Sequence, residues 1–193
     1  MRTPDLSDSL LPAIRDSGSL HQALDLGYRQ VLFERGSLLA CLGPLAAAAR
    51  QGIAVFVNLD GAEGIAPDSA ALAFLATDLG FSGVMSVRSH LLADASRFRL
   101  RTVQRIHAID STGLETGLSS IVAPGPYAIA IAPGVALPQV IGVIRAVTAT
   151  PVWGTGYITS VDQANAVLAA GAAAVSCGRP DVWRDFRPVA VRD

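Results

Sequence analysis

The chain of 193 residues contains no lysine, so all fifteen of its Lys+Arg residues are arginine. This absence excludes any mechanism that needs a Schiff-base lysine. There are only two cysteines, Cys41 and Cys177, and they lack a paired spacing, which argues against a disulfide framework or a zinc site. We interpret both as small apolar packing residues. The formal net charge of −1 gives no overall attraction for nucleic acid, so RNA binding would need a local patch.

Long uninterrupted apolar runs are also missing. The most apolar stretch, 127–144, is broken by Pro133, Gly134 and Pro138, so it does not match a membrane span. The first eight residues carry acids and no apolar segment, unlike a secretory signal. We therefore expect a cytoplasmic protein with no membrane partner.

What the sequence does contain is a regular alternation of apolar runs and helical patterns. Hydrophobic residues make up 51% of the chain and are rich in alanine and valine, which favours a parallel sheet buried on both faces. We predict strands at Leu11–Arg15, Gln30–Glu34, Ala54–Leu59, Gly83–Arg88, Thr102–His107, Ala128–Ala132, Pro151–Gly154 and Ala173–Cys177. We predict helices at Leu20–Leu26, Leu38–Gln51, Ser69–Leu79, Leu91–Phe98, Gly113–Val122, Leu137–Val147, Val161–Ala170 and Asp181–Phe186.

This alternation indicates an α/β fold with right-handed crossovers, which is either a closed barrel or an open doubly wound sheet. We favour a minimal (β/α)8 TIM-like barrel, in which residues 1–193 form a single domain, because eight similar units would close. Glycines 27, 52, 80 and 171 each precede an apolar run, as left-handed residues that end helices do.

Small residues follow the last two predicted strands. Glycines at 154, 156 and 178 would let backbone amides approach an anion, and loops in this position often hold phosphate in barrels. The alternative is that these glycines only form tight turns. The predicted phosphate-binding residues are Gly154, Thr155, Gly156, Ser176, Cys177 and Gly178.

Polar residues stand at the carboxyl ends of most other strands. Arginines such as Arg15 and Arg88 bind phosphate well, and the acids Glu34, Asp60 and Glu63 can accept hydrogen bonds from hydroxyl groups. The alternative for this ring is a set of ion pairs that closes the barrel mouth. His90 and His107 are either acid–base groups or structural residues.

The basic run 97–105 is the one concentrated positive segment. Arg97, Arg99 and Arg101 are candidates for RNA-binding residues that contact phosphates. The alternative is a solvated helix end that leads into a strand.

With these residues in view, the chain resembles the glycerol-3-phosphate responsive antiterminator family over nearly its full length. The resemblance rests on the segments Pro12–Arg15, Val55–Asp60, Glu63–Gly64, Val87–Ser89, Thr102–Arg105, Asp110–Ser111, Leu114–Gly117, Pro133–Gly134 and Ala174–Ser176. It implies a barrel-like regulator of glycerol metabolism that binds glycerol 3-phosphate and acts on leader mRNA in transcription antitermination. It also implies that the ligand pocket is lined by Arg15, Asp60, Glu63, Arg88, Gln104 and Asp110.

Two other interpretations stay open. The chain is either a small barrel enzyme on a phosphorylated substrate, with Asp60 or Glu63 as general base and Arg88 as a clamp, or a phosphate-ligand sensor without RNA binding. For the regulator we expect no catalytic residues, no cofactor and no resident metal, although Asp60 and Glu63 are able to hold a hard cation beside phosphate. A homodimer is compatible with the sequence.

Overall fold

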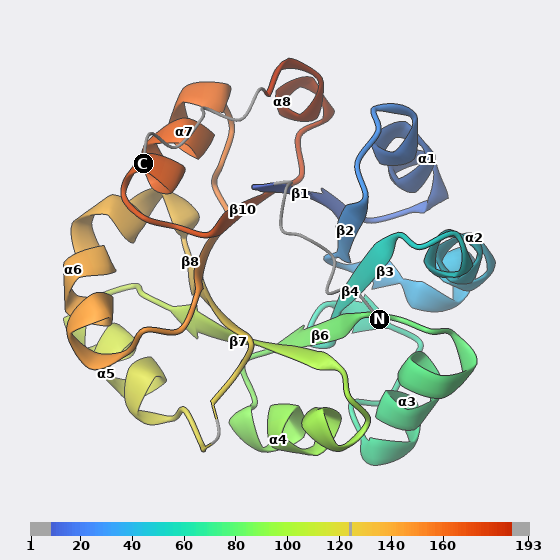
Figure 1. The fold of residues 1–193 in the computed structure, drawn as a ribbon, viewed down its shortest axis with the longest axis horizontal. Coiled ribbons are helices and arrows are strands. Elements are labelled where there is room, and N and C mark those ends of the chain that lie inside the picture. Colours follow the sequence, from blue (N-terminus) through green and yellow to red (C-terminus); the bar gives the residue numbers. More distant parts are fainter. Residues whose placement is uncertain (1–8, 124, 187–193) are drawn as a thin grey trace.

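In the computed structural model, eight parallel strands close into a barrel and helices surround it (Figure 1). The structure describes residues 9–123 and 125–186. Around the barrel the strands follow the order β1-β10-β9-β8-β7-β6-β4-β2, and β2 closes back onto β1 in parallel. The barrel strands are β1 (Leu10–Ile14), β2 (Gln30–Phe33), β4 (Ala54–Asn58), β6 (Gly83–Ser86), β7 (Arg101–His107), β8 (Ala128–Ala132), β9 (Val152–Thr155) and β10 (Ala174–Cys177).

Each barrel strand is followed by a helical segment, which confirms the predicted alternation and the (β/α)8 barrel. The helical segments are α1 (Ser17–Asp25), α2 (Leu38–Arg50), α3 (Ser69–Ala73) with the π-helix η1 (Phe74–Asp78), α4 (Ser89–Arg97), α5 (Ser111–Ser119), the 3-10 turn η2 (Gly134–Ala136) with α6 (Leu137–Val147), α7 (Val161–Ala169) and α8 (Pro180–Asp185). A separate two-stranded parallel sheet pairs β3 (Gly36–Ser37) with β5 (Ala62–Glu63). No helix in the described ranges is long and apolar enough to cross a membrane.

The helix boundaries follow local sequence signals. The side chains of Asp16, Ser37, Asp68, Asp110 and Ser160 each accept a backbone N–H at the start of a helix. The four glycines predicted to end helices all have positive φ, between 66° and 106°. These caps explain why the boundaries fall close to the predicted ones.

Two apolar clusters hold the fold together. One fills the space between the sheet and the helices, and the other fills the barrel interior. Strand β8 shows how the sequence assigns its side chains, because its isoleucines, Ile129 and Ile131, join the outer cluster while Ala128 and Ala130 face inward. The small inward residues leave room for Trp153, which is fully buried and packs edge-on against Phe56 at 5.4 Å between ring centroids.

Candidate functional site

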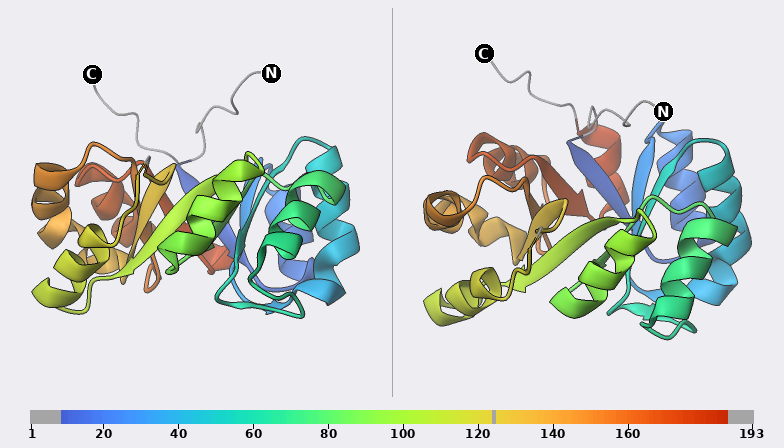
Figure 2. Two further views of the ribbon diagram at one scale, coloured as in Figure 1. Left: turned by 90° about the horizontal axis from the view of Figure 1, so that it is seen from below. Right: turned by 60° about the horizontal axis from the view of Figure 1, so that its bottom comes forward.

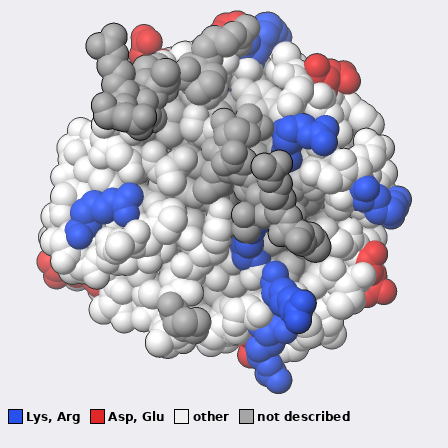
Figure 3. Space-filling model, viewed as in Figure 1, with Lys and Arg blue, Asp and Glu red and all other residues white. Residues whose placement is uncertain are grey.

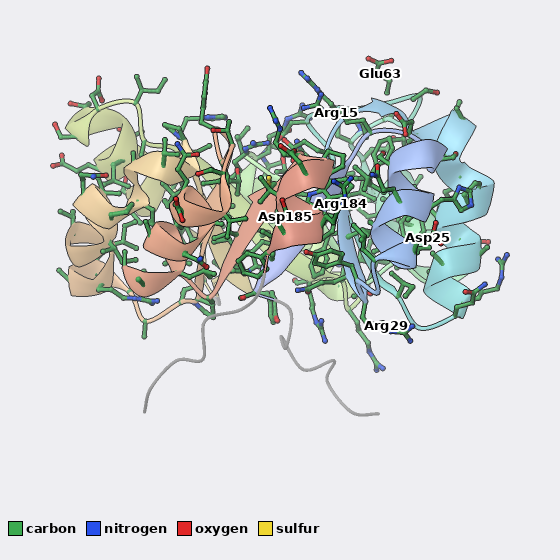
Figure 4. The ribbon with its side chains drawn as sticks, turned by 90° about the horizontal axis from the view of Figure 1, so that it is seen from above. Arg15, Asp25, Arg29, Glu63, Arg184 and Asp185 are labelled. Carbon is green, nitrogen blue, oxygen red and sulfur yellow. The ribbon has the colours of Figure 1, made fainter. Side chains whose placement is uncertain are left out.

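The mouth formed by the carboxyl ends of the strands holds a cavity of about 500 Å³. Figure 4 shows this edge at the top, with Arg15 after β1 on it, whereas Arg29 before β2 lies at the opposite edge. The cavity is lined by Ala13, Arg15, Glu34, Arg35, Gly156, Tyr157, Ile158, Thr159, Ser176, Cys177, Gly178 and Arg179. These residues follow β1, β2, β9 and β10, which are neighbours in the barrel.

Two of the three arginines that line the cavity have unpaired guanidinium groups. Neither Arg15 nor Arg35 forms an ion pair or a side-chain hydrogen bond with any described residue, and both are exposed. Arg179 differs, since it donates to both carboxylate oxygens of Asp181 at 2.9 and 2.7 Å. The unpaired groups place two uncompensated positive charges at the cavity.

The Arg179–Asp181 pair changes the protonation behaviour of both residues. Hydrogen bonds from Arg179 lower the pKa of Asp181 from 3.8 to about 2. The same bonds raise the pKa of Arg179. Asp181 therefore stays ionised and holds the guanidinium near the start of α8.

A buried ion pair crosses the mouth below the loops. Arg105 of β7 donates to the Glu34 carboxylate at 2.8 Å and to the Thr155 hydroxyl at 3.2 Å. The side chains of Arg105 and Glu34 are only 14% and 19% exposed. Glu34 Oε2 and Arg105 Nε have no hydrogen-bond partner among the described residues. The pair joins strands on opposite sides of the mouth and leaves buried polar capacity unused.

The loop after β9 begins one residue later than predicted. Gly154 lies inside β9, and an added Cβ would come within 2.6 Å of Val167, so this glycine allows close packing. Thr155 is fully buried, and its hydroxyl accepts from Arg105. Of the three predicted phosphate residues in this loop, only Gly156 lines the cavity, with a φ of 81°. Tyr157 follows with the unusual φ of 59° and is 80% exposed.

The loop after β10 reaches the cavity with all three predicted phosphate residues, Ser176, Cys177 and Gly178. The Cys177 thiol donates to the Ile158 carbonyl at 3.2 Å, and its sulfur accepts from the Arg179 amide at 3.4 Å. Burial raises the pKa of Cys177, so this thiol is a packing group rather than a nucleophile. The Ser176 hydroxyl and the Gly178 backbone remain as polar groups that a ligand can meet.

The other predicted ligand residues lie outside this cavity. The Asp60 carboxylate accepts from the Ser86 hydroxyl at 3.0 Å and from the Val87 amide at 2.7 Å, and it lies 3.5 Å from Arg88 Nε. These bonds organise the loop between β6 and α4. Glu63 is exposed on β5, and its side chain points away from the barrel in Figure 4.

Gln104 and Asp110 are engaged elsewhere. Val103 belongs to the interior cluster, so Gln104 must face outward, and its amide donates to the Val87 carbonyl at 3.2 Å. Asp110 caps α5 by accepting from Gly113 at 2.7 Å. Of the six residues implied by the resemblance, Arg15 alone lines the mouth cavity.

A family model for the glycerol-3-phosphate responsive antiterminator matches residues 10–183, which include the whole barrel. The chain belongs to this family. No curated protein sequence matches it significantly.

Two solved structures with related descriptions share the family's fold. A glycerol uptake operon antiterminator regulatory protein from Listeria monocytogenes is 25% identical, with a TM-score of 0.86, and the match covers 96% of this chain and 100% of that one. A glycerol uptake operon antiterminator-related protein from Thermotoga maritima is 22% identical, with a TM-score of 0.77, covering 91% and 98%.

The barrel is also shared with an enzyme. A deoxyribose phosphate aldolase from Aeropyrum pernix is 14% identical, with a TM-score of 0.73, covering 93% of this chain and 89% of that one. At this identity the likeness shows the fold alone.

Sequence reasoning missed two arginines of this family member as site residues. Arg35 follows Glu34 at the end of β2, and Arg105 stands beside the predicted Gln104. The signal for Arg105 is the alternation of β7, because a strand that turns Val103 inward also turns Arg105 inward. Arg35 lies in a loop, where no periodicity decides the direction of a side chain.

The basic run lies on the strand-start face, opposite the mouth. Figure 3 views this face, and blue side chains gather where α4 ends and β7 begins. Arg97 is 77% exposed, with Asp94 at 3.8 Å, and Arg99 has a positive φ of 61° just past the helix. Arg101 is half-buried, with its guanidinium 5.2 Å from the centre of the Tyr127 ring. Arg97 and Arg99 are thus the more accessible members.

Proposed function

We propose that this chain is a ligand-responsive antitermination regulator that binds glycerol 3-phosphate in the mouth cavity and leader mRNA elsewhere. The observation that carries the ligand is the pair of unpaired guanidinium groups, Arg15 and Arg35, at a cavity of about 500 Å³. That volume suits a small molecule, and two positive charges match a phosphate dianion. Membership of the family and the printed descriptions of the two regulators support the regulatory role.

In this proposal the phosphate lies between the two arginines and the loops after β9 and β10. Gly156 and Gly178 carry no side chain, so their backbone approaches the anion, and Ser176 supplies a hydroxyl. Arg forms paired hydrogen bonds with phosphate oxygens, which a lysine would not reproduce. Tyr157 stands at the rim, where its ring covers the bound ligand.

Leader mRNA is assigned to the strand-start face, through Arg97, Arg99 and Arg101. The two sites then lie at opposite ends of the barrel, so the ligand acts on RNA through a coupling free energy. Coupling is reciprocal, and RNA must therefore change ligand affinity by the same factor as the ligand changes RNA affinity.

Calorimetry with glycerol 3-phosphate, glycerol and inorganic phosphate tests the ligand. We expect glycerol 3-phosphate to bind more tightly than phosphate, and glycerol to bind least, without turnover of any of them. Product formation from a phosphorylated compound would instead favour the enzyme interpretation. Electrophoretic binding to the leader transcript, with and without glycerol 3-phosphate, tests the regulator, and a complete lack of RNA binding at low salt would contradict it.

A further inference from the structure

A groove runs between α4 and α5 over the outer surface of β7, away from the mouth cavity. It consists of a hollow of about 510 Å³ and a smaller one, which adjoin at Gln104 because both are lined by it. Figure 2 shows β7 between these two helices. From here on, the α4–α5 groove denotes the surface lined by Val87, Ser89, Leu92, Ala93, Ser96, Thr102, Gln104, Arg105, Ile106, His107, Ile109, Asp110, Thr112, Gly113, Thr116, Gly117, Ser120, Val122, Ala123, Gly125 and Pro126.

The floor of this groove is unusually polar for the outer surface of a barrel strand. The outward residues of β4 and β8, such as Val55 and Ile129, belong to the apolar cluster under the helices. On β7 the corresponding positions hold Thr102 and Gln104, which are 6% and 3% exposed. The Gln104 carbonyl oxygen accepts no hydrogen bond from any described residue, although its amide donates to Val87. A buried amide with a free acceptor is suited to a polar partner.

The walls add hydroxyl groups and exposed apolar side chains. Serines and threonines of both helices line the groove, at positions 89, 96, 112, 116 and 120. Ile109 is 84% exposed and Val87 40% exposed at the end nearer the mouth. Asp110 is the one carboxylate in the lining, and it is bound to the Gly113 amide.

Charge distinguishes the two ends of the α4–α5 groove. At the strand-start end, α4 finishes in Arg97 and the chain continues through Arg99 to Arg101, so three guanidinium groups adjoin the groove. Arg101 lies against Tyr127, which follows Pro126 of the lining. A strand of nucleic acid meets positive charge there and hydrogen-bonding groups along the floor.

We propose that the α4–α5 groove binds single-stranded RNA, with the backbone held by the arginines and bases lying on the polar floor. The inference rests on the proposed regulatory function and extends its RNA surface from a charged patch to a groove that reads bases. Unpaired RNA bases are recognised by hydrogen bonds to their edges and by contact with flat or apolar side chains. Gln104 and the helix hydroxyls supply the former, and Ile109 and Val87 supply the latter.

The test places negative charge in the α4–α5 groove at two exposed helical positions. Ser96→Glu and Thr116→Glu lie on opposite walls, and Ala146→Glu on the exposed face of α6 is the control with the same charge change. The probes are 15-nucleotide oligoribonucleotides that tile the leader transcript, with the matching DNA set. We expect each groove variant to weaken RNA binding about tenfold, and the control to change it less than about twofold.

Each outcome decides between the groove and the function on which it rests. Wild-type RNA binding that both groove variants retain would overturn the groove and leave the regulator standing, whereas no RNA binding by the wild type would overturn both. If the variants change the mass in sedimentation but not RNA affinity, the α4–α5 groove is a contact between copies. Photocrosslinking of the wild type to 4-thiouridine RNA gives an independent readout, since the crosslinked peptides must fall within 87–126.

Discussion

The two ends of the barrel interior differ in chemistry although the same strands build both. At the strand-start end the inward residues include Leu32, Val103 and Trp153, all fully buried. Two residues further along the same strands stand Glu34, Arg105 and Thr155, which form the polar layer under the mouth. Successive inward positions in a strand are two residues apart, so one step converts a packed core into a ligand site.

This difference separates stability from binding within a few ångströms. The apolar half stabilises the fold through area removed from water, and the polar half is held by directed bonds that leave Glu34 Oε2 and Arg105 Nε unpaired. Substitutions in the first half should act on unfolding, and those at the mouth on ligand affinity. The following predictions test that separation, from the largest effect to the smallest.

Replacement of the largest inward residue should have the greatest effect. We expect Trp153→Ala to lower the free energy of unfolding by about 4 kcal/mol, because it removes a fully buried ring that packs against Phe56. Urea denaturation measures the loss. Val147→Ala, at a 66% exposed position on α6, should change it by less than about 0.5 kcal/mol. A similar stability for the two variants would contradict the core assigned to this half.

The buried ion pair should behave as part of the fold even though it lies at the mouth. We expect Glu34→Gln to cost about 3 kcal/mol in unfolding free energy, because Arg105 would keep a buried charge without its partner. Glu63→Gln removes an exposed carboxylate and serves as the control. A double-mutant cycle with Arg105→Gln isolates the pairwise energy, and a coupling near zero would show that the pair contributes nothing.

The unpaired arginines should act on binding alone. We expect Arg15→Gln and Arg35→Gln each to weaken glycerol 3-phosphate binding by about 2 kcal/mol, since each removes charge-assisted hydrogen bonds to phosphate. Calorimetry measures the affinity and urea denaturation the stability, which should stay unchanged. Arg50→Gln at the end of α2 is the matched control. Loss of stability with unchanged affinity would assign both arginines to the structure instead.

The basic run should affect RNA and leave the ligand alone. We expect Arg97→Gln with Arg99→Gln to reduce the dependence of RNA affinity on log salt by about 0.7 per lost phosphate contact. Arg101 is kept because it packs on Tyr127. Electrophoretic titrations at several salt concentrations give the slope. An unchanged slope would remove this run from the RNA surface.

The smallest effect concerns the arginine that is already paired. Asp181→Asn frees Arg179 at the cavity, so phosphate-ligand affinity should rise about threefold. Because Arg179 holds the pKa of Asp181 at about 2, below its ordinary 3.8, the pair stabilises the fold above about pH 4. That contribution is lost as the pH falls through about 2. NMR titration of the Asp181 carboxyl measures the pKa, and an ordinary value would contradict the pairing.

The sequence by itself determined the strand–helix order, the closed barrel and most helix ends. Each of these depends on local signals, such as the Asp16 and Ser160 caps or the alternating isoleucines of β8. The resemblance identified the family, and the loops after the last two strands do border the cavity through Gly156 and Gly178.

Only the tertiary structure decided which polar residues meet at the mouth. Gln104 and Arg105 are neighbours in sequence, yet closure of the barrel turns one toward the helices and the other toward Glu34, which is far away in the chain. Gly154 reads like a loop glycine, but the length of β9 places it against Val167. The direction of a side chain at a strand end depends on register and on distant partners, and a single sequence records neither.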